Sequence, residues 1–154
     1  MAELESIQEM DDETFFRELI NYRNSGSNYF ASYIGIELTE LGLGWAVAEI
    51  DLEQHHYNPI GSIHGGCLFA LADSVGGSAA CTRRRPVTTV NSSISYVTAA
   101  INTKKLIAKA TEIKAGKKTC VYRVDIFNDD GVLLVTSTMT YFYLKGEIRF
   151  PGAD

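Results

Sequence analysis

The chain has 154 residues, 45% of them hydrophobic, which fits one globular domain with one hydrophobic core. Its formal net charge of -5 argues against nucleic acid or an anionic membrane as the main partner. The acidic opening MAELESIQEMDDE lacks the apolar run of a secretory signal, and no stretch approaches the roughly 20 apolar residues that span a bilayer. Three cysteines without CxxC spacing predict neither a disulfide frame nor a zinc knuckle, so we expect a cytoplasmic location.

Charge is unevenly distributed along the chain. Residues 1–53 hold twelve acidic side chains against only Arg17 and Arg23, whereas residues 83–118 hold nine basic side chains against the lone Glu112. The basic segment is suited to a compact anion such as a phosphorylated cofactor. The alternative is a solvated strand face, which position alone favours for most of the lysines.

Residues 11–23, DDETFFRELINYR, predict an amphipathic helix. Acidic residues occupy its first turn, and apolar residues from Phe15 to Ile20 recur at helical spacing. The sequence SGSN at 25–28 ends the helix.

A hairpin-like pair of strands is predicted next. Residues 28–41 indicate a short helical turn leading into a strand. After the break at 42–44, the sequence WAVAEIDLEQ alternates between two sets of side chains, as a strand does.

One long helix is predicted from Gly65 to about Thr82, where RRRP stops it. Four strands follow without another helix, and hairpin turns are expected at Gly116-Lys117 and at 128–131. The predicted strands are residues 87–99, 104–115, 119–128 and 132–144.

A central helix followed by a long antiparallel meander predicts an α+β fold, in which the curled sheet wraps around the helix. Residues 1–28 are then an N-terminal helical extension, and residues 29–154 form a single domain. The extension either covers part of a groove or packs on the sheet edge.

The central helix has two faces of different character. Leu68, Leu71, Ala72, Val75 and Ala79 form the stripe expected to face the sheet. The opposite stripe contains Gly66, Phe69, Asp73, Gly76 or Gly77, and Ala80. Small residues let another backbone come close, so the second stripe is expected to meet another surface. The alternative, that the glycines serve only close packing on the sheet, leaves the acid unexplained.

The stretch HHYNPIGSIHGGCLFALADS concentrates the chemistry. A helix that begins near Gly65 offers unpaired N–H groups and the positive end of its dipole, which makes an oxyanion-hole candidate. Gly66 and Asp73 are separated by roughly 10 Å of helix, too far for both to act on one reacting group. We therefore expect a site between two subunits, with Asp73 of one chain facing the Gly65 amide of the other.

The same stretch resembles the signature of hotdog-fold thioesterases of the phenylacetyl-CoA (PaaI-like) type, approximately N-x(5)-H-G-G-x(2)-F-x-L-A-D. The resemblance implies a hotdog fold over roughly residues 30–145. By that resemblance Asp73 is general base or nucleophile on the thioester, the Gly65 N–H polarises its carbonyl, and Asn58 orients the carbonyl or a water. His64 shapes the turn. The predicted substrate contacts are Gly66, Thr89, Phe69, Arg83 and Arg84.

These residues also have structural interpretations. Asp73 could pair or cap within the fold, His64 could be only a hydrogen-bonded residue before the helix, and Asn-Pro is a common turn initiator. The three histidines and Glu53 make no recognised ligand spacing, so we expect no metal.

The predicted function is therefore hydrolysis of an aromatic or short to medium acyl-CoA by a homo-oligomer, dimer or tetramer. Coenzyme A enters only as part of the substrate, and no other cofactor is expected. The alternatives are a non-catalytic acyl-CoA binding protein and a hotdog enoyl-CoA hydratase. Against hydration, the chain lacks the Asp and His of the hydratase pattern D-x-N-P-x-H around Asn58.

Overall fold

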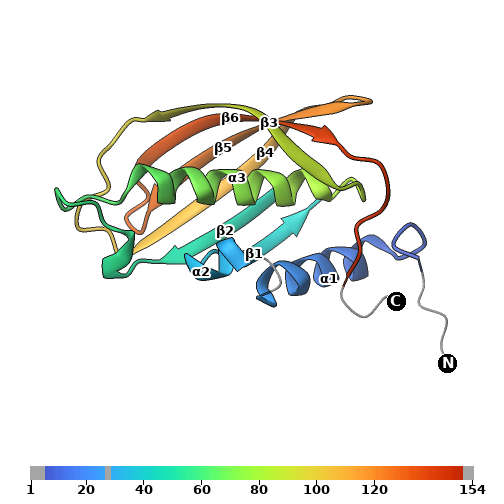
Figure 1. The fold of residues 1–154 in the computed structure, drawn as a ribbon, viewed down its shortest axis with the longest axis horizontal. Helices are drawn as coiled ribbons and strands as arrows, with labels where there is room; N and C mark the ends of the chain where they lie inside the picture. Colours follow the sequence, from blue (N-terminus) through green and yellow to red (C-terminus); the bar gives the residue numbers. More distant parts are fainter. Residues whose placement is uncertain (1–5, 27–28, 151–154) are drawn as a thin grey trace.

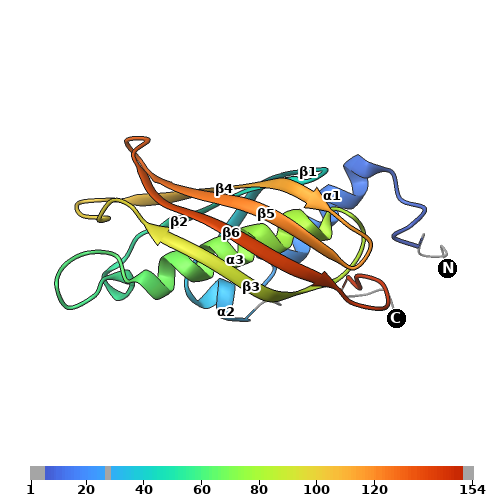
Figure 2. The same cartoon turned by 90° about the horizontal axis from the view of Figure 1, so that it is seen from above.

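The longest helix of the protein, α3 (Gly65–Cys81), lies against one face of a six-stranded antiparallel sheet. Figure 1 presents the computed structural model, which describes residues 6–26 and 29–150, and Figure 2 shows the strands passing over the helix. The stripe predicted to face the sheet is buried in full, which confirms that α3 forms the centre of the core. Its members are Leu68, Leu71, Ala72, Val75 and Ala79.

All six predicted strands are present, and the predicted α+β arrangement is confirmed. The order across the sheet is β1-β2-β4-β5-β6-β3. The strands are β1 (Glu37–Gly42), β2 (Trp45–Asp51), β3 (Val87–Tyr96), β4 (Lys105–Ala115), β5 (Thr119–Asn128) and β6 (Leu133–Tyr143).

The prediction of one long meander is wrong for β3. Strands β4, β5 and β6 do form a meander, but β3 pairs with β6 at the far edge, from Val87 opposite Tyr143 to Tyr96 opposite Val135. The polar strand VTTVNSSISY is largely exposed, as suits an edge, whereas β4 alternates buried and solvent-facing residues as an interior strand does. Pairing therefore follows burial rather than order along the chain.

The predicted N-terminal helix is confirmed as α1 (Asp12–Asn24), which begins at the cap residue Asp11. Its buried Phe15 and Leu19 form a second apolar cluster with parts of the chain distant in sequence, among them Cys81 at the end of α3. The short helical turn is α2 (Tyr29–Tyr33), and a single 3-10 turn spans Gln54–His56. The predicted boundary at 28/29 falls at residues 27–28, which lie outside the described part of the chain.

Asn24 attaches α1 to the free edge of the sheet. Its side-chain Nδ2 donates to the carbonyl of Leu38 at 2.9 Å, and its Oδ1 accepts from the Leu38 N–H at 2.9 Å. These two bonds satisfy backbone groups of the edge strand β1 that no neighbouring strand pairs. The end of α1 is therefore held at a defined place beside α3.

Gly76 allows α3 to approach the sheet closely. A Cβ added to Gly76 would overlap the hydroxyl of Tyr141 in β6, and it would lie 3.2 Å from the ring carbon Cζ. At Gly77 the nearest Tyr141 atom would lie 3.6 Å away, an ordinary contact. Of the two glycines, only Gly76 is thus required for close packing, and it belongs to the sheet-facing side of the helix.

We predict that Gly76→Ala lowers the free energy of unfolding by about 1–3 kcal/mol, because the added methyl overpacks the core. Gly77→Ala is the matched control and should raise stability by up to about 1 kcal/mol through helix propensity. Urea denaturation of both variants measures the difference. In a Tyr141→Phe background the Gly76→Ala cost should shrink; an unchanged cost would show that the hydroxyl is not the obstacle.

Candidate active site

The start of α3 leaves one glycine amide unpaired. His64 is the N-cap residue, and its Nδ1 accepts a hydrogen bond from the Gly66 N–H at 2.8 Å. The Gly65 N–H donates to no acceptor in the described part of the chain. The N–H of Gly66 is therefore used in the helix cap. The N–H of Gly65 remains available to an acceptor at the positive end of the helix dipole. His64 takes the turn-shaping position that was predicted for it.

The loop before α3 is held by Asn58. Its Oδ1 accepts from the N–H groups of Ile60 and Ser62, both at 3.1 Å, and its Nδ2 donates to the Ser62 hydroxyl at 2.8 Å. Gly61, with a φ of +86°, completes the turn in a conformation that favours glycine. The side-chain amide of Asn58 thus organises the loop that precedes Gly65. This contact pattern agrees with the structural interpretation of the Asn-Pro pair as a turn initiator.

His56, which the sequence analysis did not select as a site residue, also supports this loop. It is buried, its Nδ1 accepts from the Glu53 N–H at 2.8 Å, and its Nε2 lies 2.9 Å from the carbonyl oxygen of Ile34. These partners require the neutral ring with the proton on Nε2. The carbonyl of His56 also accepts from the His64 N–H at 2.8 Å. The adjacent histidines of HHYNP were visible, but nothing local distinguishes the buried one.

Asp73 lies at the middle of α3, and the residue is partly exposed. Its Oδ1 accepts a hydrogen bond from the Thr89 hydroxyl in β3 at 2.6 Å, so the structure brings together two residues predicted for the site. In the part of the chain that the structure describes, Asp73 forms no ion pair. Because one oxygen is held by a hydroxyl and no cation neutralises it, the carboxylate is positioned to attack or to accept a proton.

Tyr141 joins this carboxylate-bearing turn to the sheet. Its hydroxyl donates to the backbone carbonyl of Asp73 at 2.9 Å. Burial raises the pKa of Tyr141, and the nearby Asp73 carboxylate raises it further, so the hydroxyl remains a donor. Cys67, two residues after Gly65, is not a competing nucleophile, because burial raises the pKa of its thiol to about 11.

Gly65 and Asp73 open into two separate pockets of one chain. Asp73 and Thr89 line a pocket of about 290 Å³ together with parts of α1 and α2. Gly65 lines another pocket of about 280 Å³ with Ser62 and Tyr96. Phe69 lies between them on α3, half-buried, and lines neither. The two chemical halves of the site are therefore not assembled within one chain.

The edge strand between these pockets exposes apolar side chains. Val90 and Tyr96 of β3, and Val97 just after it, are each more than half exposed. The unpaired side of such a strand is suited to pairing with another chain.

The arginines predicted to contact substrate lie beyond the other end of α3 and have internal partners. Arg83 forms a two-bond pair with Glu112, at 3.0 and 2.7 Å. Arg84 pairs with Asp12 at 2.7 Å, donates to the carbonyl of Ile7, and lies over the ring of Phe15, 4.5 Å from its centroid. These guanidinium groups hold the N-terminal segment and strand β4 in place.

The described residues hold neither a candidate metal site nor a candidate membrane-spanning helix. No group of three or more potential metal-ligating side chains occurs within residues 6–26 and 29–150. None of the helices in those ranges is long and apolar enough to span a membrane.

Comparison with known structures identifies the class of fold. The PaaI protein from the phenylacetic acid degradation operon of E. coli superposes with a TM-score of 0.77 at 23% identity, over 86% of this chain and 98% of that one. That similarity confirms the predicted hotdog fold.

The family follows from the sequence matches. A profile of the thioesterase superfamily matches residues 60–135. Human acyl-coenzyme A thioesterase 13 is 30% identical over 114 residues, which cover 73% of this chain and 81% of the human protein. The chain belongs to the thioesterase superfamily, and the predicted enzyme class, thioester hydrolase, is confirmed.

One related structure contains coenzyme A. It is a hypothetical thioesterase protein of Streptococcus pneumoniae TIGR4, 28% identical, with a TM-score of 0.73 over 79% of this chain and 96% of that one.

The Arg83–Glu112 pair generates a prediction about pH. The Arg83 guanidinium holds the pKa of Glu112 below its ordinary 4.5, and the Tyr122 hydroxyl lowers it further. Because the folded-state pKa is the lower one, the pair stabilises the protein above the ordinary pKa and loses that contribution as the pH falls through the folded-state pKa. Glu112→Gln should thus lower the free energy of unfolding by up to about 1 kcal/mol at neutral pH, and by less under acid conditions.

Denaturation with urea at a series of pH values checks this. Glu147→Gln is the matched control, since Glu147 is exposed and has no ion-pair partner among the described residues. A difference between wild type and Glu112→Gln that stays constant below pH 4.5 would contradict the assignment.

Proposed function

We propose that the protein hydrolyses acyl-CoA thioesters carrying an aromatic or a short to medium acyl group, in an active site that two subunits share. The observation that carries the proposal is the geometry of α3. One helix presents an unpaired N–H at Gly65 and a hydroxyl-held carboxylate at Asp73, and the two open into different pockets.

The chemistry needs both groups at one thioester carbon. Asp73, directly or through a water, supplies the attack, and the Thr89 hydroxyl keeps its carboxylate oriented. The Gly65 N–H and the helix dipole stabilise the oxyanion of the tetrahedral intermediate. Where a water attacks, Asp73 takes its proton; collapse of the intermediate then breaks the carbon–sulfur bond, the thiolate of coenzyme A leaves and takes up that proton, and the acyl group leaves as a carboxylic acid. Where Asp73 attacks directly, collapse releases the thiolate and leaves a mixed anhydride with Asp73, which a water then hydrolyses to the acid and the free carboxylate.

A homodimer supplies both groups at one place. Eight residues of helix separate Gly65 from Asp73 in one chain, or roughly 12 Å. In a twofold dimer built on the exposed edge of β3, the Gly65 end of one α3 comes beside Asp73 of the other, which produces two equivalent sites. Whether two dimers pair into a tetramer does not affect this arrangement.

The acyl-CoA assignment takes support from relatives. The human relative is named an acyl-coenzyme A thioesterase, and the pneumococcal relative was solved with coenzyme A. Arg83 and Arg84 stay the proposed contacts for the phosphates of coenzyme A, which would compete with Glu112 and Asp12 for them. No other cofactor enters the proposal. The three free cysteines of the protein suit a reducing compartment such as the cytoplasm.

Two inactive variants test the shared site. Asp73→Asn keeps the acceptor for Thr89 and should lower kcat by about 10²–10⁴-fold. Gly65→Pro removes the N–H at the first helical position, where proline is tolerated, and should lower kcat by about 10²–10³-fold. Gly65→Ala is the matched control, because it retains the N–H and its Cβ would lie 3.4 Å from Tyr96, an ordinary contact.

Mixing the two variants distinguishes a shared site from one within a chain. In a mixed dimer, one site combines the intact Gly65 of one chain with the intact Asp73 of the other. After unfolding and refolding together, free-thiol release should recover to about a quarter of the wild-type rate, since about half the dimers are mixed and each has one working site. No recovery would contradict the shared site.

A panel of acyl-CoAs, from short aliphatic to phenylacetyl and hydroxybenzoyl, measures the substrate class. Binding of acyl-CoA by the wild type without any thiol release would overturn hydrolysis and favour the non-catalytic alternative.

A further inference from the structure

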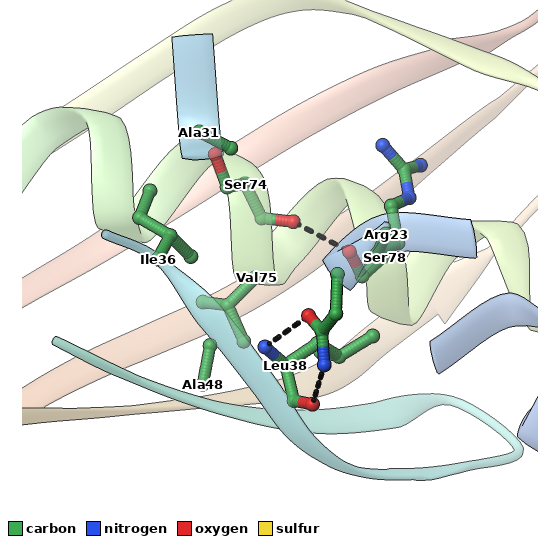
Figure 3. A pocket seen from close by; sticks show the side chains of 9 residues that line it. Arg23, Ala31, Ile36, Leu38, Ala48, Ser74, Val75 and Ser78 are labelled. Carbon is green, nitrogen blue, oxygen red and sulfur yellow. Dashed lines mark hydrogen bonds between the residues drawn. The ribbon is translucent and has the colours of Figure 1, made fainter. Parts of the chain in front are cut away.

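Arg23, in the last turn of α1, reaches the pocket that contains Asp73. It lines that pocket of about 290 Å³ together with Asp73, Ser74 and Thr89. Figure 3 shows a second, adjoining pocket that Arg23 also lines, where its side chain lies beside Ser78 of α3, and Ser74 lies close to Ala31 of α2. The neighbouring Asn24 is bonded twice to β1, so the turn that carries the guanidinium is held in place.

This guanidinium is poorly satisfied within its own chain. Its Nε is buried and has no hydrogen-bond partner, and one terminal nitrogen donates to the sulfur of Cys81 at 3.4 Å, a weak acceptor. Within residues 6–26 and 29–150 no carboxylate lies within ion-pair distance of it. Arg83 and Arg84, by contrast, each have a carboxylate partner.

Although the residue is partly exposed, a buried nitrogen without a partner costs free energy, and an acceptor supplied from outside would improve the hydrogen bonding of this guanidinium. The rest of the pocket lining indicates what that acceptor would be attached to. The lining is mixed: Ser74, Thr88 and Thr89 are polar, whereas Phe30 and Ala31 of α2 and Val87 of β3 add apolar surface. A short chain of methylenes suits the apolar part, while a carboxylate accepts two parallel bonds from a guanidinium.

We propose that Arg23 recognises a carboxylate at the far end of the acyl group, so that the preferred substrates are coenzyme A monothioesters of dicarboxylic acids. The inference rests on the proposed function, because it places the thioester at Asp73. The phosphates of coenzyme A are a poor alternative for Arg23, since the pantetheine arm separates them from the thioester, whereas Arg23 and Asp73 share one pocket.

Matched substrates test the proposal. Glutaryl-, adipoyl- and suberoyl-CoA are compared with pentanoyl-, hexanoyl- and octanoyl-CoA, which have the same chain lengths and lack the terminal carboxylate. The wild type should favour the dicarboxylic member of at least one pair by about 10- to 100-fold in kcat/KM, as expected for hydrogen bonds to a charged group. Arg23→Met should remove that preference, with most of the loss in KM, and Arg23→Lys should keep part of it.

Arg17→Met is the control, since it removes the same charge from the same helix at an exposed position and should leave the preference unchanged. A wild type that favours the monocarboxylic thioesters, or a preference that survives Arg23→Met, would overturn the proposal. So would an equal loss of affinity for free coenzyme A in Arg23→Met, which would assign the arginine to a phosphate.

Binding separates this inference from the proposed reaction. Dissociation constants for adipoyl- and hexanoyl-CoA are measured by calorimetry with Asp73→Asn and with Asp73→Asn/Arg23→Met. A dicarboxylic preference that is present in the first and absent in the second supports the Arg23 assignment even if the wild type releases no thiol. Equal affinities in the first variant would overturn it even if hydrolysis is confirmed.

Discussion

The hydroxyl of Tyr141 donates to the backbone carbonyl of Asp73, and its ring occupies the space that a side chain at Gly76 would need. This contact joins the sheet to α3 at the turn that carries the carboxylate. Close approach of helix and sheet buries one face of α3 completely, and the remaining surface of the helix is left to do chemistry. The position of Asp73 therefore depends on two neighbouring strands, because Tyr141 of β6 lies directly opposite its hydrogen-bond partner Thr89 of β3.

α3 contributes to the candidate site at two places, its first turn and its middle. At its start the cap made by His64 consumes the Gly66 amide and leaves that of Gly65 unpaired. Near its middle, Thr89 orients a carboxylate that has no cationic partner in the described chain. A rigid helix holds these points at a fixed separation, so one chain cannot close them on a single thioester carbon. The proposal of a site shared by two subunits rests on this helix geometry.

Much of the fold was predictable, because its elements are marked by local patterns. The bounds of α1 and α3 follow from capping residues and apolar spacing, and every strand was placed within a few residues. The position of β3 was not predictable in this way. Consecutive strands usually pair, and only the polar, exposed character of β3 places it at the edge beside β6.

Among the site residues, local motif and tertiary role coincide only in part. Asp73 and Thr89, both predicted for the site, lie in hydrogen-bond contact, and the Asn58 amide is used within its own loop, one of the two roles that the sequence left open. The motif gave no sign that His56 supports that loop. Nor did it point to Arg23, which lies some fifty residues before Asp73 on a different helix.

By itself the sequence determined the elements, the stripe of α3 that faces the sheet, and the residues able to perform thioester chemistry, since each depends on neighbours within a few positions along the chain. Only the tertiary structure decided which of those residues meet, which are occupied, and which are free. Hydrogen-bond partners and ion pairs such as Arg83–Glu112 join segments far apart in the sequence. Whether such partners meet depends on how the sheet curls around α3, and no local sequence pattern determines that curvature.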